Sequence, residues 1–208
     1  MDRTPAQLDT QLDESTVDRS PINQFRKWFE AALASGSRLP ESMTLATSTR
    51  DGKPSARVVL LKQVDDDGFV FYTNYRSAKA RELSENPEAA LVFYWVGLDR
   101  QVRVEGTVAK VSANESDEYF KTRPRESQLG ALASPQSEVI ESREVLENRL
   151  SELEERYRDK AVERPEHWGG YRLKPVRIEF WENRPGRLHD RILYQYEGGS
   201  WSISRLAP

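Results

Sequence analysis

Residues 43–74, MTLATSTRDGKPSARVVLLKQVDDDGFVFYTN, carry the clearest fold signal in the chain. The runs 43–49, 55–64 and 69–74 are rich in β-branched and aromatic residues, and the polar sequences RDGKP and DDDG separate them. Runs of this kind, bounded by turns that contain aspartate and glycine, are typical of β-hairpins. The stretch therefore predicts a meander of three antiparallel strands.

The rest of the chain continues the β pattern, with helices between groups of strands. Further strands are predicted at 89–96, 100–112, 172–182, 191–197 and 200–207, and helices at 20–36, 77–87, 115–123 and 142–160. Ser20 and Pro21 suit the start of the first helix and Gly36 suits its end. Many short strands with helices inserted between them indicate a mainly β fold, a closed or nearly closed antiparallel barrel with peripheral helices.

The two parts of the chain differ in composition. Residues 1–19 are polar and acidic without periodicity, which predicts a flexible N-terminal arm. Residues 20–208 are predicted to form a single domain. Apolar residues concentrate in 43–110 and 168–206, so we expect the core there.

Composition excludes several classes of protein. The 208 residues carry a net charge of −3, which argues against a general nucleic-acid binder. The absence of cysteine and the presence of only two histidines argue against disulfides, thiol chemistry and a metal site. No apolar run approaches the about 20 residues needed to cross a bilayer, and the N-terminus lacks the apolar core of a signal peptide. We expect a soluble, cytoplasmic protein.

Basic side chains gather in clusters, although no glycine-rich phosphate loop is present. Arg57 and Lys62 bracket the apolar run VVLL, and Ser77 and Lys79 stand at a helix start, where the helix dipole favours an anion. A third cluster surrounds a proline-broken loop and contains Tyr119, Arg123, Arg125, Ser127, Gln136 and Ser137. The alternatives are solvent-exposed cations, a simple helix cap and a charged helix end.

The fourth cluster is RPGRLHDR, residues 184–191, which Trp181 precedes. Arg187, His189 and Arg191 occupy every second position, and on an extended chain they would point the same way. One face with these side chains next to a tryptophan can bind a planar, anionic, aromatic ligand. A solvent-exposed hairpin is the alternative, and Arg184 and Asp190 are predicted to be structural.

Several motifs in this order resemble the pyridoxamine/pyridoxine 5′-phosphate oxidase family. They are RVVLLK, FYTNYRSAKA, RQVRVEG, YFKTRPRESQLGA, SPQS, WGGYR, IEFWENRPGRLHDR and RLAP, and together they extend from about residue 20 to the C-terminus. The resemblance implies an FMN-binding split β-barrel that forms a homodimer with FMN in two clefts at the interface. It implies oxidation of pyridoxine or pyridoxamine 5′-phosphate to pyridoxal 5′-phosphate, with O2 as acceptor and H2O2 as product.

The same resemblance assigns roles by motif position. Arg57, Lys79, Gln136 and Ser137 would hold the FMN phosphate and ribityl chain. The rest of the flavin site would comprise Val58, Val59, Leu60, Leu61, Lys62, Tyr72, Thr73, Ser77, Gln101, Trp181 and Arg191. Lys62, Tyr119, Arg123 and Ser127 would bind the substrate phosphate. Arg187 and His189 would flank the substrate's pyridine ring as the catalytic residues.

The chain departs from the family pattern at three places. Ala78 stands where the family usually has an arginine between Ser77 and Lys79, so Arg76 would have to compensate or FMN would bind more weakly. Leu132 stands where a tryptophan is common, which affects packing. An Arg-x-x-Tyr motif that closes over the substrate is absent from residues 1–19.

Two other functions remain open. One is an FMN oxidase of the same fold that acts on another aromatic substrate; Lys62, Tyr119, Arg123 and Ser127 argue against it, because they suit a phosphate. The other is a protein that binds FMN or pyridoxal phosphate without turnover.

Overall fold

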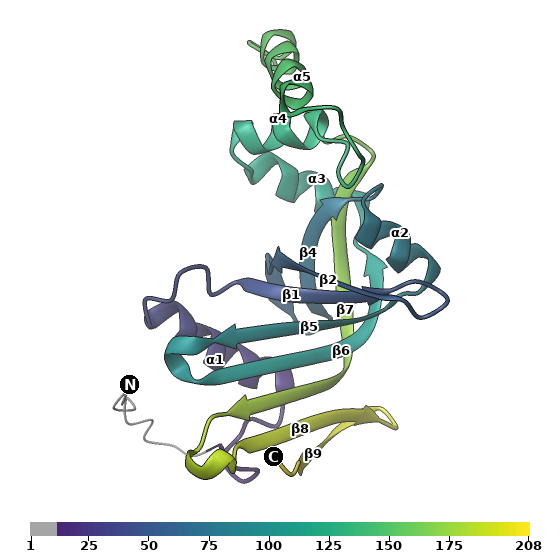
Figure 1. Ribbon diagram of the computed structural model, residues 1–208. Coiled ribbons are helices and arrows are strands. Elements are labelled where there is room, and N and C mark those ends of the chain that lie inside the picture. The colour runs from purple at the N-terminus through teal and green to yellow at the C-terminus, as the bar shows by residue number, and fades with distance from the viewer. Residues whose placement is uncertain (1–11) are drawn as a thin grey trace.

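The computed structural model describes residues 12–208 and shows a strongly curled antiparallel sheet beneath a layer of helices (Figure 1). The strands are β1 (Ser42–Ser48), β2 (Pro54–Leu60), β3 (Gln63–Asp65), β4 (Gly68–Asn74), β5 (Glu88–Trp95), β6 (Arg100–Lys110), β7 (Trp168–Glu182), β8 (Asp190–Glu197) and β9 (Ser200–Arg205). The helices are α1 (Pro21–Ala34), α2 (Ala78–Glu85), α3 (Ala113–Thr122), α4 (Arg125–Ala133) and α5 (Arg143–Arg156), with short 3-10 turns η1 (Val96–Leu98) and η2 (Pro185–Arg187).

The order of the strands explains the curl. Neighbouring strands follow the path β2-β1-β5-β6-β7-β4-β3, with β8 paired to β7 and β9 to β8. Strands β2 and β3 therefore lie at opposite ends of the path, although only Leu61 and Lys62 separate them in the chain. The sheet has to curl until its two ends meet, which gives the predicted barrel-like form.

The predicted three-strand meander is right in its two hairpins and wrong in treating 55–64 as one strand, because this run divides into β2 and β3. Strand β2 pairs with β1, but β4 pairs with β7 and with the short β3. The run 55–64 breaks at Leu61, whose N–H bonds Glu41, while the N–H of Lys62 bonds the carbonyl of Val70. Strand propensity locates strands but does not specify their partners, and here a distant strand pairs more extensively with β4 than its sequence neighbour does.

Helix α1 fills the interior of the curled sheet. The Ser20 side chain accepts a hydrogen bond from the Asn23 N–H, which confirms the predicted cap. The ring of Phe25 is fully buried, 4.8 Å from the Phe69 ring centroid and 4.9 Å from that of Phe93. The main core thus joins α1 to strands from both sides of the curl, largely within the predicted ranges.

Helices α3, α4 and α5 form a separate layer beyond one end of the barrel, at the top of Figure 1. A second apolar cluster of Phe120, Leu129, Val162 and Trp168 holds this layer to the start of β7. Helix α4 replaces part of the loop that the sequence suggested around Pro124: the proline ends α3, and a new helix begins at the next residue. Leu150, Leu153 and Tyr157 of α5 pack against this cluster from the predicted stripe.

The segment before α1 is packed against the domain. Residues 1–11 of the predicted arm lie outside the described residues. Leu12, by contrast, is buried, and the Tyr194 hydroxyl donates a 2.6 Å hydrogen bond to the carbonyl of Asp18. Residues 12–19, which composition assigned to a flexible arm, are therefore anchored on the C-terminal strands. Within residues 12–208, no helix combines the length and the apolar character that a membrane span requires.

Candidate active site

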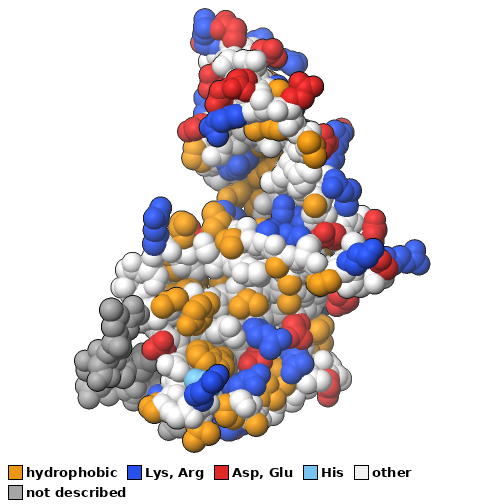
Figure 2. Space-filling view, in the orientation of Figure 1, with side chains coloured by type: hydrophobic (Ala, Val, Ile, Leu, Met, Phe, Trp, Pro, Cys, Tyr) orange, Lys and Arg blue, Asp and Glu red, His pale blue; other side chains and the backbone are white. Residues whose placement is uncertain are grey.

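A cavity of about 670 Å³ lies between the barrel and the helical layer. Strands β2 and β4 form one wall, and α2, α3 and the ends of α4 form the others. Its lining residues are Arg57, Val58, Val59, Leu60, Lys62, Tyr72, Thr73, Asn74, Lys79, Tyr119, Thr122, Arg123, Pro124, Ser127, Ser134, Gln136 and Trp168. Figure 2 shows the molecule narrowing at this level, with basic side chains around the waist.

Lys79 is a buried cation in this cavity. The residue is 8% exposed, and its Nζ donates to the Thr73 hydroxyl at 3.1 Å and to the Gln136 side-chain oxygen at 3.3 Å. Burial lowers the pKa of Lys79, and the neighbouring Arg57 guanidinium lowers it further. No carboxylate of the described residues forms an ion pair with Lys79, although the charge of Glu82 partly offsets the lowering of its pKa. A buried cation without a counter-ion favours an anionic ligand.

Arg57 differs from Lys79 because it has a counter-ion. Its Nη2 lies 3.0 Å from Glu82 Oε2 on α2, and its guanidinium also contacts Thr47 and Ser55. Ser55 donates a 2.7 Å hydrogen bond to the same Glu82 oxygen. The ion pair fixes Arg57 at the cavity wall beside Lys79. Arg76, the proposed substitute for the arginine missing at position 78, is exposed and does not line the cavity.

Arg123 supplies a second cation without a counter-ion. Its guanidinium lies 4.5 Å from the Trp168 ring centroid, and its Nη1 is buried without a hydrogen-bond partner, the one such side-chain atom within the described range. Burial lowers the pKa of Arg123, although guanidinium groups remain protonated in proteins. A buried N–H donor without a partner costs free energy unless a ligand satisfies it. Arg123 is therefore preorganised for an anion.

An aromatic stack of three rings lines the same cavity. The Tyr72 ring lies 4.0 Å from that of Tyr119 and 5.3 Å from that of Trp168, and all three rings are nearly parallel. Burial raises the pKa of Tyr72 to about 12, so its hydroxyl stays neutral. Gly170 makes room for the stack, because a Cβ there would lie 2.8 Å from the Tyr72 ring.

The cavity brings together most of the residues predicted for the FMN and substrate phosphates. From the predicted set, Arg57, Val58, Val59, Leu60, Lys62, Tyr72, Thr73, Lys79, Tyr119, Arg123, Ser127 and Gln136 line it. Leu61 instead packs in the main core. Ser77 is fully buried behind the cavity wall, where its hydroxyl accepts a 3.4 Å hydrogen bond from Lys79. Ser137 is exposed beside Gln136, with a left-handed backbone at φ 71°.

The remaining predicted residues lie elsewhere: Gln101 on β6, Trp181 on β7, Arg191 on β8, and Arg187 and His189 in the segment between β7 and β8. Gln101, Trp181 and Arg191 are direct cross-strand neighbours, and the His189 ring lies 4.6 Å from that of Trp181. Arg191 Nε forms a 2.8 Å ion pair with Glu179. These residues therefore form a cluster of their own, and this cluster does not line the cavity described above.

The predicted alternation within RPGRLHDR is wrong. Residues Pro185–Arg187 form the turn η2, Arg187 has a left-handed backbone at φ 64°, and β8 begins only at Asp190. Pro185 and Gly186 favour a tight turn over an extended strand. Arg187 is exposed at this turn, while Arg184 and Asp190 form a 2.6 Å ion pair and are structural, as predicted.

The two clusters lie at opposite ends of β7. Trp168, the first residue of this 15-residue strand, lines the cavity, and Trp181 stands near its other end. At about 3.3 Å per residue, the path along the strand between them is on the order of 40 Å. Figure 1 shows β7 running from the helical layer at the top to η2 and β8 at the bottom. Within one chain, His189 and Arg187 cannot reach the cavity.

Sequence reasoning missed some lining residues and misassigned one arginine. Trp168, Asn74 and Ser134 line the cavity without having been predicted; the sequence Trp-Gly-Gly, where glycines follow a large aromatic residue, was the available signal for Trp168. Arg125, counted with the phosphate-binding types, instead donates to the carbonyls of Tyr157 and Lys160 beyond α5. It is a structural cap for that helix.

The curled barrel with a cationic cavity beside it defines the class of split-barrel proteins. The same fold occurs in a pyridoxamine 5′-phosphate oxidase-related, FMN-binding protein from Nostoc punctiforme (TM-score 0.71, 20% identity, 88% of this chain and 97% of that one). Two family models match the chain: pyridoxamine 5′-phosphate oxidase over residues 29–157, and the pyridoxine 5′-phosphate oxidase C-terminal dimerisation region over residues 168–208. The chain belongs to the pyridoxamine 5′-phosphate oxidase family.

Two relatives show how far the similarity extends. A pyridoxine/pyridoxamine 5′-phosphate oxidase from Rubrobacter xylanophilus is 59% identical, over 95% of this chain and 91% of the relative. Among solved structures, PhzG from Burkholderia lata in complex with tetrahydrophenazine-1-carboxylic acid has a TM-score of 0.91 and 32% identity, over 96% of this chain and 98% of that one.

Proposed function

We propose that this protein is an FMN-dependent oxidase that converts pyridoxine and pyridoxamine 5′-phosphates to pyridoxal 5′-phosphate, with O2 as acceptor and H2O2 as product. The observation that carries the proposal is the pair of cations without ion-pair partners, Lys79 and Arg123, in one cavity that an aromatic stack also lines. FMN and the substrate each bring one phosphate monoester and one flat ring, which matches this arrangement. The reaction would supply the cell with pyridoxal 5′-phosphate.

The residues around Lys79 fit the FMN phosphate. Lys79 and Arg57 offer charge, and Thr73 and Gln136 offer polar groups that already bond Lys79. Charge-assisted hydrogen bonds of this kind are the strong ones in phosphate sites. When bound, FMN supplies a ring that accepts a hydride from the substrate and passes the electrons to O2.

The residues around Arg123 fit the substrate phosphate. Arg123 presents a buried, unsatisfied N–H, and Tyr119, Ser127 and Lys62 line the same cavity. The fork of a guanidinium can donate two parallel hydrogen bonds to a phosphate. A phosphate held there would direct the pyridine ring toward the side of the cavity where Lys79 and Arg57 would hold FMN. Hydride transfer depends more on such positioning of the two rings than on a strong acid or base.

The second cluster would come from another copy of the chain. Arg187 and His189 lie on the order of 40 Å along β7 from the cavity, within the region that matches the dimerisation model. In a homodimer, the β6–β8 cluster of one protomer would complete the cavity of its partner, with Trp181 and Arg191 beside FMN and Arg187 and His189 beside the pyridine. Apolar side chains in the middle of the face in Figure 2, and the exposed Val58, Tyr94 and Val176, give a second copy a surface to cover.

The similarity to PhzG supports a second candidate, an FMN oxidase for a carboxylated aromatic compound. Arg123 discriminates between the two, because the candidate substrates present different anions. We expect Arg123→Gln to raise KM for pyridoxine 5′-phosphate about 10- to 100-fold, since a hydrogen bond to a charged group contributes about 1.5–3 kcal/mol, with FMN affinity unchanged. Arg149→Gln, on the exposed face of α5, is the control. Turnover of a carboxylated aromatic compound that exceeds that of the phosphates would favour the second candidate.

An anaerobic reduction experiment tests the proposal itself. The purified protein is loaded with FMN, mixed with pyridoxine 5′-phosphate without oxygen, and followed at the flavin absorption band. We expect bleaching, then recovery of colour and formation of H2O2 when air is admitted. A protein that binds FMN but is not bleached by either phosphate would be a non-catalytic binder, and a protein that FMN cannot turn yellow would contradict the proposal altogether.

A further inference from the structure

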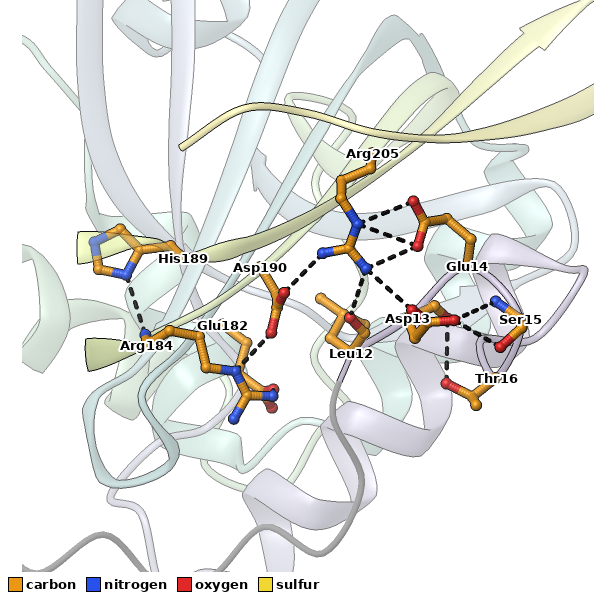
Figure 3. Close-up of polar contacts among 10 residues, drawn as sticks. All are labelled: Leu12, Asp13, Glu14, Ser15, Thr16, Glu182, Arg184, His189, Asp190 and Arg205. Atoms are coloured by element: carbon orange, nitrogen blue, oxygen red, sulfur yellow. Dashed lines mark hydrogen bonds and ion pairs between the residues drawn. The ribbon is translucent and has the colours of Figure 1, made fainter. Parts of the chain in front are cut away.

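An ion-pair network joins the segment before α1 to the turn that carries Arg187 and His189 (Figure 3). Arg205 of β9 lies at its centre. Its Nη2 lies 2.7 Å from Glu14 Oε2 and 3.3 Å from Asp13 Oδ2, and its Nη1 lies 2.7 Å from Asp190 Oδ1. Arg205 Nε also donates to Glu14, so that carboxylate accepts from two sides of the guanidinium.

The network continues from Asp190 into the turn. The second oxygen of Asp190 lies 2.6 Å from Arg184 Nε, and Arg184 Nη2 lies 2.6 Å from Glu182, which also pairs with Arg100 at 2.9 Å. Asp190 and Glu182 are buried, so these pairs are poorly screened by solvent.

The last link reaches the ring of His189. The backbone N–H of Arg184 donates to His189 Nδ1 at 3.2 Å. In the neutral ring this leaves the proton on Nε2, which can then donate to a ligand. The position of Arg184 therefore sets both the orientation of the His189 ring and the nitrogen that faces outward.

Within the turn, the Leu188 N–H donates a long, 3.4 Å hydrogen bond to the Pro185 carbonyl. Gly186 and Arg187 both have left-handed backbones, at φ 67° and 64°, and the side chains of Arg187 and Leu188 are exposed. A left-handed backbone is unfavourable for arginine. An external restraint is needed to hold such a turn in one conformation.

We propose that Asp13 and Glu14 are positioning residues for the active site: through Arg205, Asp190 and Arg184 they hold the 184–189 turn so that His189 and Arg187 face the substrate in the partner's cavity. This inference rests on the proposed function of His189 and Arg187. It assigns to the N-terminal segment a role in substrate binding that does not require the segment to touch the substrate.

The test is the double variant Asp13→Asn, Glu14→Gln in the full-length, FMN-loaded protein. Both side chains are partly exposed, Asp13 by 44% and Glu14 by 37%, so the variant should fold, with a Tm within about 2 °C of the wild type. We expect KM for pyridoxine 5′-phosphate to rise about 3- to 5-fold, the factor that corresponds to about 1 kcal/mol, while the dissociation constant for FMN stays unchanged. Asp51→Asn, which removes another exposed ion pair at the β1–β2 turn, should change neither.

A second comparison shows whether the acids act through Arg205. In an Arg205→Gln background, adding Asp13→Asn and Glu14→Gln should raise KM no further. An unchanged KM in the first variant, a parallel loss of FMN affinity, or additive effects in the Arg205→Gln background would each overturn the proposal.

A third readout does not depend on turnover. Trypsin cleavage after Arg187, followed by mass spectrometry on the FMN-loaded protein, should be faster in the acid-to-amide variant than in the wild type, because the turn opens more often. Equal cleavage rates would contradict the restraint, even if the protein proved to oxidise neither phosphate. The failure of this inference and that of the proposed function can therefore be told apart.

Discussion

At the scale of single residues, the two buried cations of the cavity are distinguished by what they lack. Arg57, Arg172 and Arg205 all have carboxylate partners, whereas no described carboxylate forms an ion pair with Lys79 or Arg123. Leaving a buried charge without a counter-ion is costly in an isolated chain. Lys79 and Arg123 both carry this free-energy cost and lie in one cavity. Two bound phosphate monoesters would supply the missing counter-charges.

Lys79→Met removes one of these cations while keeping the length of the side chain. We expect the dissociation constant for FMN to rise about 10- to 100-fold, since a charge-assisted hydrogen bond of about 1.5–3 kcal/mol is lost. Fluorescence quenching of FMN on titration with protein measures the change. Lys53→Met, at the exposed β1–β2 turn, is the matched control, and equal affinity in the two variants would remove Lys79 from the FMN site.

The affinity for FMN should also depend on pH through Lys79. Burial lowers the pKa of Lys79, so the protonated form that binds an anion is present below this lowered pKa and is lost as pH rises through it. We expect FMN affinity to fall in the alkaline range, beginning below the about 10.4 of an ordinary lysine. In Lys79→Arg this alkaline loss should disappear, because a guanidinium stays charged. An identical alkaline profile in both proteins would assign the titration to another group.

At the scale of elements, β7 connects the parts of the fold. It pairs with β4, β6 and β8, its first residue lines the cavity, and its other end carries Trp181, whose ring lies beside that of His189. Sequence patterns predicted most of its length, and they predicted the positions of the other strands. They did not predict that β4 would pair with β7 in place of β2, because propensity describes a strand and not its neighbour. The every-second-residue pattern of Arg187, His189 and Arg191 likewise did not predict the turn η2, because that pattern assumes an extended backbone.

A substitution at Gly170 tests whether the close approach of β7 to Tyr72 shapes the cavity. A Cβ at this position would lie 2.6 Å from a Val111 methyl and 2.8 Å from the Tyr72 ring. We expect Gly170→Ala to destabilise the protein by about 1–3 kcal/mol and to weaken FMN binding, because Tyr72 must leave its stack. Thermal unfolding and FMN titration measure the two effects.

Gly130→Ala provides the control for that variant. Gly130 lies in α4, where an added Cβ would have no atom within 4 Å, and alanine is the better helix former. It should leave stability equal or slightly higher and FMN affinity unchanged. If Gly170→Ala behaves in the same way, the close approach of β7 to Tyr72 does not shape the site.

At the scale of the whole molecule, the predicted site residues fall into two groups that one chain cannot bring together. The sequence motifs predicted the members of both groups, and the structure places twelve of the assigned residues around one cavity. Neither periodicity nor spacing could show that the β6–β8 cluster lies at the far end of β7, since that separation arises from the curl of the whole sheet. The central claim is therefore that one site is built from two copies of the chain.

Mixing two impaired variants, at a substrate concentration below the KM of either, tests this claim most directly. Arg123→Gln damages the cavity, and Arg187→Gln damages the distant turn, where the substitution should impair turnover and leave FMN bound. The two variants are combined, dissociated and reassembled, and H2O2 production from pyridoxine 5′-phosphate is measured. In a shared site, random pairing makes about half of the dimers mixed, each with one intact and one doubly damaged site, so we predict about a quarter of the wild-type activity. Activity that stays at the level of the separate variants would contradict the account, because both groups of residues would then serve the same chain.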